Sequence, residues 1–257
     1  MRAAWLPAGC IAAALLLGGA AARAEDATAE VDLALVLAID ASGSVSTERF
    51  RLQRQGYAAA LESGEMLRAI ETGAHGRIAV TVVEWSGMAQ QAQVTNWTLV
   101  HDAASAGRLA AAVAELPRLF GDSTSIGSAI AFSVRLLARS GYRATRQVID
   151  VSGDGRDNNG LPAAPARDAA VAAGITINGL PILDVEIGLD TYYRENVIGG
   201  PGAFVMVADD IGAFAAAIAA KLEREVANTD VPPPPRDRPE TAVLVRTAKD
   251  GSMPPPE

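Results

Sequence analysis

The chain has 257 residues, of which 49% are hydrophobic and 20% are charged, and its formal net charge is −8. This length suits one large domain or two small ones, and the composition is that of a globular α/β protein with a sizeable apolar core. The acidic balance disfavours binding to nucleic acid and to anionic membranes.

The first 24 residues are predicted to be a signal peptide. Arg2 provides a basic start, the short apolar stretch CIAAALLLGGA follows, and Ala22-Arg23-Ala24 forms an A-x-A cleavage site. Cleavage would remove Cys10, the only cysteine, and leave 20 basic and 30 acidic residues, a net charge of −10. We therefore expect a periplasmic or secreted protein without disulfides or thiol chemistry, and without stable membrane insertion after the signal peptide is removed.

Strands and helices alternate through a single predicted domain, residues 25–228. The first strand is almost continuously apolar, as expected for a strand buried on both faces. The more polar strand at 91–100 follows its predecessor after a short turn, which favours an antiparallel edge pair. The predicted strands are 31–39, 76–87, 91–100, 146–153, 175–183 and 203–209, and the predicted helices are 46–63, 105–116, 125–140, 166–174, 190–196 and 211–226.

This order predicts an α/β fold: a doubly wound, mostly parallel sheet with one antiparallel edge strand and helices on both faces. Residues 229–257 are proline-rich, charged and without hydrophobic periodicity, and we expect them to form a disordered tail.

Three predicted loops carry side chains with oxygen donors. Sites in sheets of this kind lie beyond the carboxyl ends of the strands, so these loops should meet. Oxygen donors without histidine or thiol select a hard cation, and few carboxylates combined with hydroxyls fit Mg²⁺ better than Ca²⁺. The loops contain Asp40, Ser42 and Ser44 after the first strand, Asp122, Ser123, Thr124 and Ser125 before the helix at 125–140, and Asp154, Asp157 and Asn158 after the strand at 146–153.

The combination of Asp40-Ala-Ser42-Gly-Ser44, Thr124 in STSIGSAI and Asp154 in VSGDGRDNN resembles the metal-ion-dependent adhesion site of von Willebrand factor type A domains. The resemblance covers residues 31–227, and the opening is also similar to an exported bacterial family of unknown function. It implies a Rossmann-like fold of the type A class.

By this resemblance, Ser42, Ser44 and Thr124 are hydroxyl ligands, and Asp40 and Asp154 bind the ion directly or through water. It implies Mg²⁺, with Mn²⁺ and Ca²⁺ as alternatives, and an open coordination position for an Asp or Glu of a protein partner. The family more often has Thr where this chain has Gly153, a departure that would loosen a supporting hydrogen bond.

Each residue also has a purely structural interpretation. Ser42 or Ser44 could cap a helix, a role that we favour for Ser46, and Asp154 could be a turn residue. Other polar loop residues, Asp122 and Asp157 among them, are more often solvated.

Other functions remain as alternatives. A phosphatase of the haloacid dehalogenase type would use Asp40 as nucleophile, but it needs a second aspartate where Ser42 stands and a lysine, and no lysine occurs before Lys221. A phosphate group bound at ASGSVS would be repelled by Asp40 and Asp154 unless a cation lay between them. The sequence also has no G-x-S-x-G elbow, the motif that would support a serine hydrolase. The sequence therefore predicts a Mg²⁺-dependent protein-binding module that is not an enzyme.

Overall fold

The computed structural model describes residues 29–227. The predicted signal peptide (1–24) and tail (229–257) lie outside the described residues. Within them, no helix combines the length and apolar character needed to cross a membrane. The elements are β1 (Glu30–Asp40), α2 (Thr47–Leu61), α3 (Gly64–Glu71), β2 (Ile78–Trp85), β3 (Gln91–Gln93), β4 (Thr98–Val100), α4 (Ala103–Ala114), α5 (Ile126–Leu137), β5 (Arg143–Gly153), α6 (Ala163–Ala172), β6 (Thr176–Pro181), α7 (Leu189–Tyr192), the π-helical turn η1 (Tyr193–Val197) and α8 (Phe214–Ala227).

The sheet has the strand order β3-β2-β1-β5-β6, and β4 also pairs with β2. Strand β1 lies between β2 and β5 and is parallel to both, and β6 is parallel to β5. Strands β3 and β4 are antiparallel to β2. The predicted doubly wound, mostly parallel sheet with an antiparallel edge is therefore confirmed.

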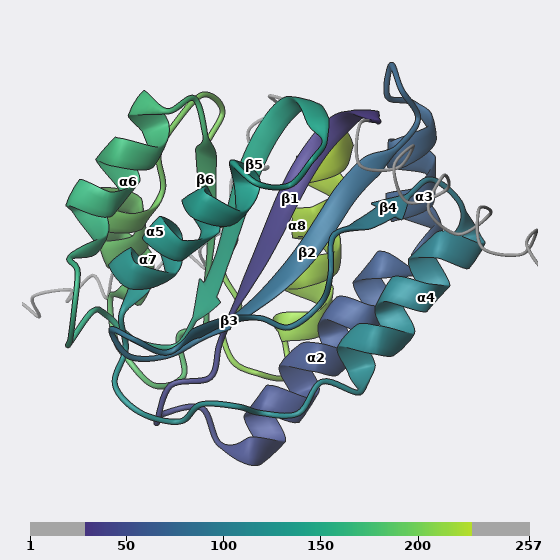
Figure 1. Cartoon of the computed structure of the whole chain (residues 1–257). Helices are drawn as coiled ribbons and strands as arrows, with labels where there is room; N and C mark the ends of the chain where they lie inside the picture. Colours follow the sequence, from purple (N-terminus) through teal and green to yellow (C-terminus); the bar gives the residue numbers. More distant parts are fainter. Residues whose placement is uncertain (1–28, 228–257) are drawn as a thin grey trace, which may run out of the picture.

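Helices cover both faces of the sheet (Figure 1). Alternating side chains of β1 pack into the two apolar layers that result. Leu33, Leu35 and Leu37 face the core shared with α2, α3, α4 and α8. Ala34 and Ala38 face the core shared with α5, α6 and η1. Because each buried leucine contributes about 2 kcal/mol of transfer free energy, this buried strand anchors both layers and fixes where its last residue, Asp40, lies.

Two elements differ from the sequence prediction near the start of the fold. The helix predicted over 46–63 ends at Leu61, and a separate helix, α3, begins at Gly64 after Ser63, whose side chain accepts a hydrogen bond from the Met66 N–H. The single strand predicted over 91–100 is divided into β3 and β4. Between them Thr95 turns toward β2, where its carbonyl accepts from the Thr81 hydroxyl and its own hydroxyl accepts from the Val82 N–H.

The strand predicted over 203–209 is only partly formed. Val205 and Ala208 make isolated parallel bridges to Gly179 and Ile182. The N–H of Phe204 donates instead to the side-chain oxygen of Asn178, at 2.9 Å. This side-chain acceptor replaces a backbone partner, so a continuous ladder does not develop at this edge.

Candidate metal centre

Asp40 and Ser42 begin a tight loop at the carboxyl end of β1. The Ser42 N–H donates to Asp40 Oδ1 at 2.6 Å, and the hydroxyls of Ser42 and Ser44 lie 3.3 Å apart. Asp40 and Ser42 are fully buried, whereas Ser44 is exposed. Ser46 caps α2 by accepting from the Arg49 N–H, which confirms the role predicted for it. The oxygen atoms of this loop therefore extend from the buried Asp40 and Ser42 to the solvent-exposed Ser44.

Asp154 reaches the same point from β5. The Ser44 hydroxyl donates to Asp154 Oδ1 at 2.5 Å, and the Asp154 N–H donates to Asp40 Oδ2 at 3.3 Å. Asp154 is 1% exposed. Residues separated by 110 positions or more along the chain are thus held together at one edge of the sheet because β1 and β5 are parallel neighbours that end side by side.

The loop that carries Thr124 contacts both other loops. The backbone of Thr124 is held twice by Asn158: the Thr124 N–H donates to Asn158 Oδ1 at 2.9 Å, and the Asn158 N–H donates to the Thr124 carbonyl at 3.0 Å. Its hydroxyl is 3.9 Å from the position that a Cβ on Gly155 would occupy. The neighbouring Asp122 carbonyl accepts from the Gly43 N–H at 2.6 Å. The structure therefore brings all three predicted loops together.

Asp157 also links two of the loops. Its carboxylate accepts from the Ile126 N–H in the first turn of α5 and from the Tyr192 hydroxyl. Burial raises its pKa, and hydrogen bonds from backbone N–H groups oppose that rise. It is therefore a half-buried cap of α5, and the expectation that it is a solvated loop residue is wrong.

The electrostatics at the centre favour a cation. Burial, together with the nearby Asp154 carboxylate, raises the pKa of Asp40 to about 7. Burial also raises the pKa of Asp154, against hydrogen bonds from Ser44 and Arg49. Among residues 29–227, no basic side chain forms an ion pair with Asp40. Two buried carboxylates with this little compensation would be relieved by a bound cation.

The donor set is hard and contains few carboxylates. Across the described residues, no group of three or more His, Cys, Asp or Glu side chains is arranged to hold a metal ion. The predicted ligands offer two carboxylates and three hydroxyls instead, a donor set that suits Mg²⁺ completed by water. The residues present therefore fit a hard divalent cation.

No local sequence signal marks Arg49, which is the one basic side chain among residues 29–227 that forms an ion pair with a predicted ligand. Its guanidinium lies 3.2 Å from Asp154 Oδ2 and also pairs with Asp184, in the loop after β6. The single positive charge of Arg49 is thus shared by the carboxylates of Asp154 and Asp184, and Asp40 adds a third carboxylate. Negative charge therefore remains in excess, and the ion pair with Asp184 connects the loop after β6 to the centre.

Tyr193 and Trp85 line the buried side of the centre. A Cβ on Gly153 would lie 2.8 Å from the Tyr193 hydroxyl, 2.9 Å from Asp40 Oδ2 and 3.3 Å from Trp85 Cζ2. The Tyr193 hydroxyl and Trp85 Nε1 are buried without a hydrogen-bond partner. A side chain on residue 153 would therefore collide with Tyr193 and Asp40, so the structure leaves no room here for the Thr that the resemblance implies. The sequence shows that residue 153 is a glycine, but it does not show that the Tyr193 hydroxyl occupies the space beside it.

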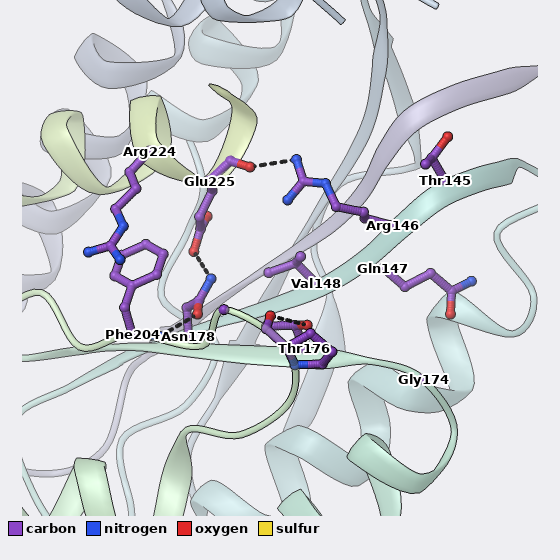
Figure 2. A pocket seen from close by; sticks show the side chains of 12 residues that line it. Thr145, Arg146, Gln147, Val148, Gly174, Thr176, Asn178, Phe204, Arg224 and Glu225 are labelled. Carbon is purple, nitrogen blue, oxygen red and sulfur yellow. Dashed lines mark hydrogen bonds between the residues drawn. The ribbon is translucent and has the colours of Figure 1, made fainter. Parts of the chain in front are cut away.

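A second feature lies at the opposite edge of the sheet, away from every predicted site residue. A cavity of about 360 Å³ is lined by the first residues of β5 and β6 and the end of α8. In Figure 2 the Glu225 side chain reaches Asn178, and Arg146 reaches the Glu225 carbonyl. Glu225 also pairs with Lys221, whose Nζ lies 2.6 Å from Asp150 Oδ1, and all three side chains are buried. The buried Lys221 thus forms ion pairs with two buried carboxylates.

Comparison with solved structures identifies the class of this fold. Crystal form 2 of proximal thread matrix protein 1 from the mussel byssus matches with a TM-score of 0.61 and 13% identity, over 77% of this chain and 49% of that chain. The same mussel protein with a zinc-occupied MIDAS motif gives 0.56 and 14%, over 77% and 48%. A von Willebrand factor type A structure from Catenulispora acidiphila gives 0.50 and 18%, over 77% and 42%.

The domain therefore has the von Willebrand factor type A fold, and the matched part corresponds to half or less of each of these structures. The chain belongs to the family described as "Protein of unknown function (DUF1194)", which matches residues 30–230. No curated protein sequence matches the chain.

Proposed function

We propose that this domain binds one divalent cation, Mg²⁺ in preference to Mn²⁺ or Ca²⁺, through Asp40, Ser42, Ser44, Thr124 and Asp154. The observation that carries the proposal is the meeting of two buried aspartates from parallel strands with the hydroxyls of Ser42 and Ser44, while no basic side chain among residues 29–227 forms an ion pair with Asp40. The zinc-occupied MIDAS motif of the mussel protein with the same fold supports a divalent metal in this class.

The proposed role is capture of a protein partner by one of its carboxylates. When bound, the cation supplies a positive charge that attracts an Asp or Glu side chain. The chain's own residues hold that charge between the buried Asp40 and the exposed Ser44, so that one side faces solvent. In this proposal the signal peptide directs the protein to the periplasm or the exterior, where it acts as a binding module of residues 25–228 and not as an enzyme.

The phosphatase alternative is weakened by the surroundings of Asp40. Ser42 stands where that chemistry needs a second carboxylate, and its hydroxyl faces Ser44. Lys221 is fully buried against Asp150 and Glu225, so it does not reach the Asp40 loop. Phosphoryl transfer needs a group that steadies the phosphoryl charge. Arg49 is already paired with two aspartates, and the Arg118 guanidinium donates to the carbonyls of Ala41 and Ser42.

Calorimetric titration of the full chain with Mg²⁺ and Mn²⁺ tests the cation site. Asp40→Asn with Asp154→Asn should weaken binding by more than about 100-fold, since even outer contacts of metal ligands are worth 10- to 100-fold. Asp102→Asn is the matched control, because Asp102 caps α4 far from the site and Asn is an equally good cap. Equal affinity in the wild type and the double variant would remove the proposed site. Metal-dependent phosphatase turnover abolished by Asp40→Asn would favour the enzyme instead.

A further inference from the structure

The large apolar side chains that are exposed among residues 29–227 all lie on loops at the edge of the sheet where the candidate metal centre forms. We call them the apolar rim: Met88, Leu119, Leu161, Val185 and Ile187. Met88 follows β2, Leu119 precedes Thr124, Leu161 follows Asp154, and Val185 and Ile187 follow β6. Ile187 is 96% exposed. Scattered exposed apolar residues need no explanation, but their confinement to one edge indicates an interaction surface.

The loop after β6 shows how the rim is presented. Its residues alternate in direction: Asp184 pairs with Arg49, and Glu186 pairs with Arg156 Nε at 2.8 Å and accepts from the Arg156 N–H at 2.9 Å. Val185 and Ile187, between and after these acids, are exposed. The acids hold the loop against the metal-site loops, and the apolar side chains are left facing solvent.

The other side of the rim is fixed in a similar way. Gly160, with φ of +75°, lies so close to Met88 that a Cβ at this position would be 2.9 Å from the Met88 Cβ. Met88 therefore lies against the loop that carries Leu161. Across the site, the Leu119 N–H donates to Glu84 at 2.6 Å, which holds that loop at the end of β2.

This arrangement identifies a chemistry for the partner. We propose that the domain recognises a polypeptide segment in which an Asp or Glu is flanked by large apolar side chains. The carboxylate would complement the proposed cation, and the flanking side chains would cover the apolar rim. This inference rests on the proposed function and adds specificity to it: a free carboxylate or an acid with polar neighbours would satisfy the cation but leave the rim in water.

A displayed peptide library with a central Asp or Glu and four random residues on each side tests the inference. Selection on the full chain in Mg²⁺, with a parallel selection in chelator, should enrich Leu, Ile, Val, Met or Phe beside the acid only in Mg²⁺. A synthetic peptide from the enriched set should bind Val185→Ser with Ile187→Ser at least tenfold more weakly than wild type, with Mg²⁺ affinity unchanged. The matched control is Ala111→Ser with Ala112→Ser, on the exposed face of α4.

The outcomes separate the two proposals. If Mg²⁺ binds but the selected acids have polar neighbours, or the peptide binds the double variant equally well, the inference fails while the metal site stands. If Mg²⁺ does not bind in titration, the proposed function itself fails. A concentration-dependent dimer that Val185→Ser with Ile187→Ser abolishes would assign the rim to a second copy of this chain and overturn the inference.

Discussion

The hydroxyl of Tyr193 occupies the space beside Asp40 that a side chain on Gly153 would need, with 2.8 Å between Oη and the Cβ position. Gly153→Ala should therefore destabilise the fold by about 1–3 kcal/mol through overpacking. Tyr193→Phe should cost less, because the hydroxyl has no hydrogen bond to lose. The double variant should recover part of the Gly153→Ala loss, which urea unfolding of all four proteins would measure. Strictly additive losses would contradict this relationship.

The buried group of Asp150, Lys221 and Glu225 predicts a pH-dependent stability. Burial and the nearby Glu225 raise the pKa of Asp150 to about 7, against the attraction of Lys221. A carboxyl with a raised pKa in the folded state stabilises the protein fully below its unfolded pKa, near 4, and this contribution is lost as the pH rises through about 7.

Asp150→Asn should therefore flatten the fall in the free energy of unfolding between pH 4 and pH 7. The difference in slope from wild type approaches the value for one proton, about 1.4 kcal/mol per pH unit. Urea titrations at four pH values give both slopes. Parallel curves for the two proteins would show that Asp150 titrates alike in the folded and unfolded states.

Asn158 should position Thr124 without being a ligand itself. Two hydrogen bonds join the two residues: the Thr124 N–H donates to the Asn158 side chain, and the Asn158 N–H donates to the Thr124 carbonyl. Asn158→Ala should weaken Mg²⁺ binding by roughly 10-fold, as expected for a contact that orients a ligand. Asn158→Asp keeps the side-chain acceptor and should retain most of the affinity. Calorimetric titration compares the three proteins, and equal weakening by both substitutions would argue against a positioning role.

Arg49 should oppose the cation. Its guanidinium pairs with Asp154, so a cation bound at the proposed site would share that carboxylate with Arg49. Arg49→Gln removes a like charge and should tighten Mg²⁺ binding by roughly threefold to tenfold at low salt, with a smaller gain at high salt. Arg51→Gln is the matched control on the same helix, where the arginine pairs with the exposed Glu48 and donates to Gln55. Weaker binding in Arg49→Gln would instead mean that Arg49 orients Asp154.

The sequence was sufficient to predict the sheet and the convergence of the loops, because both follow from local patterns. The apolar run before Asp40 marks a buried strand, and the alternation with helices places the ends of such strands along one edge. Ser63 could also have indicated a second helix start, since it lies three residues before Met66 as a cap should. The apolar pattern of α2 continues to Leu61, close to Ser63, and so favours a single helix over two.

The supporting contacts could not be predicted in the same way. Arg49 lies far from Asp184 and Tyr193 in the sequence, and each of the three has an ordinary local interpretation as a surface or core residue. Their roles arise only when α2, η1 and the loop after β6 pack around the end of β1. The metal-ligand roles of Asp40, Ser42, Ser44, Thr124 and Asp154 remain predictions that the titrations above test.

Both ends of the described chain lie at the edge of the sheet opposite Asp40: the Ala29 carbonyl accepts from the Arg143 N–H, and Arg146 donates to the carbonyl of Glu225 near the end of α8. A protein immobilised through either of these ends would present the face that carries Asp40 and the apolar rim outward. The attachment point and the proposed partner-binding face would thus lie at opposite edges of the sheet. A tether at either chain end would therefore not block a partner that binds beside Asp40.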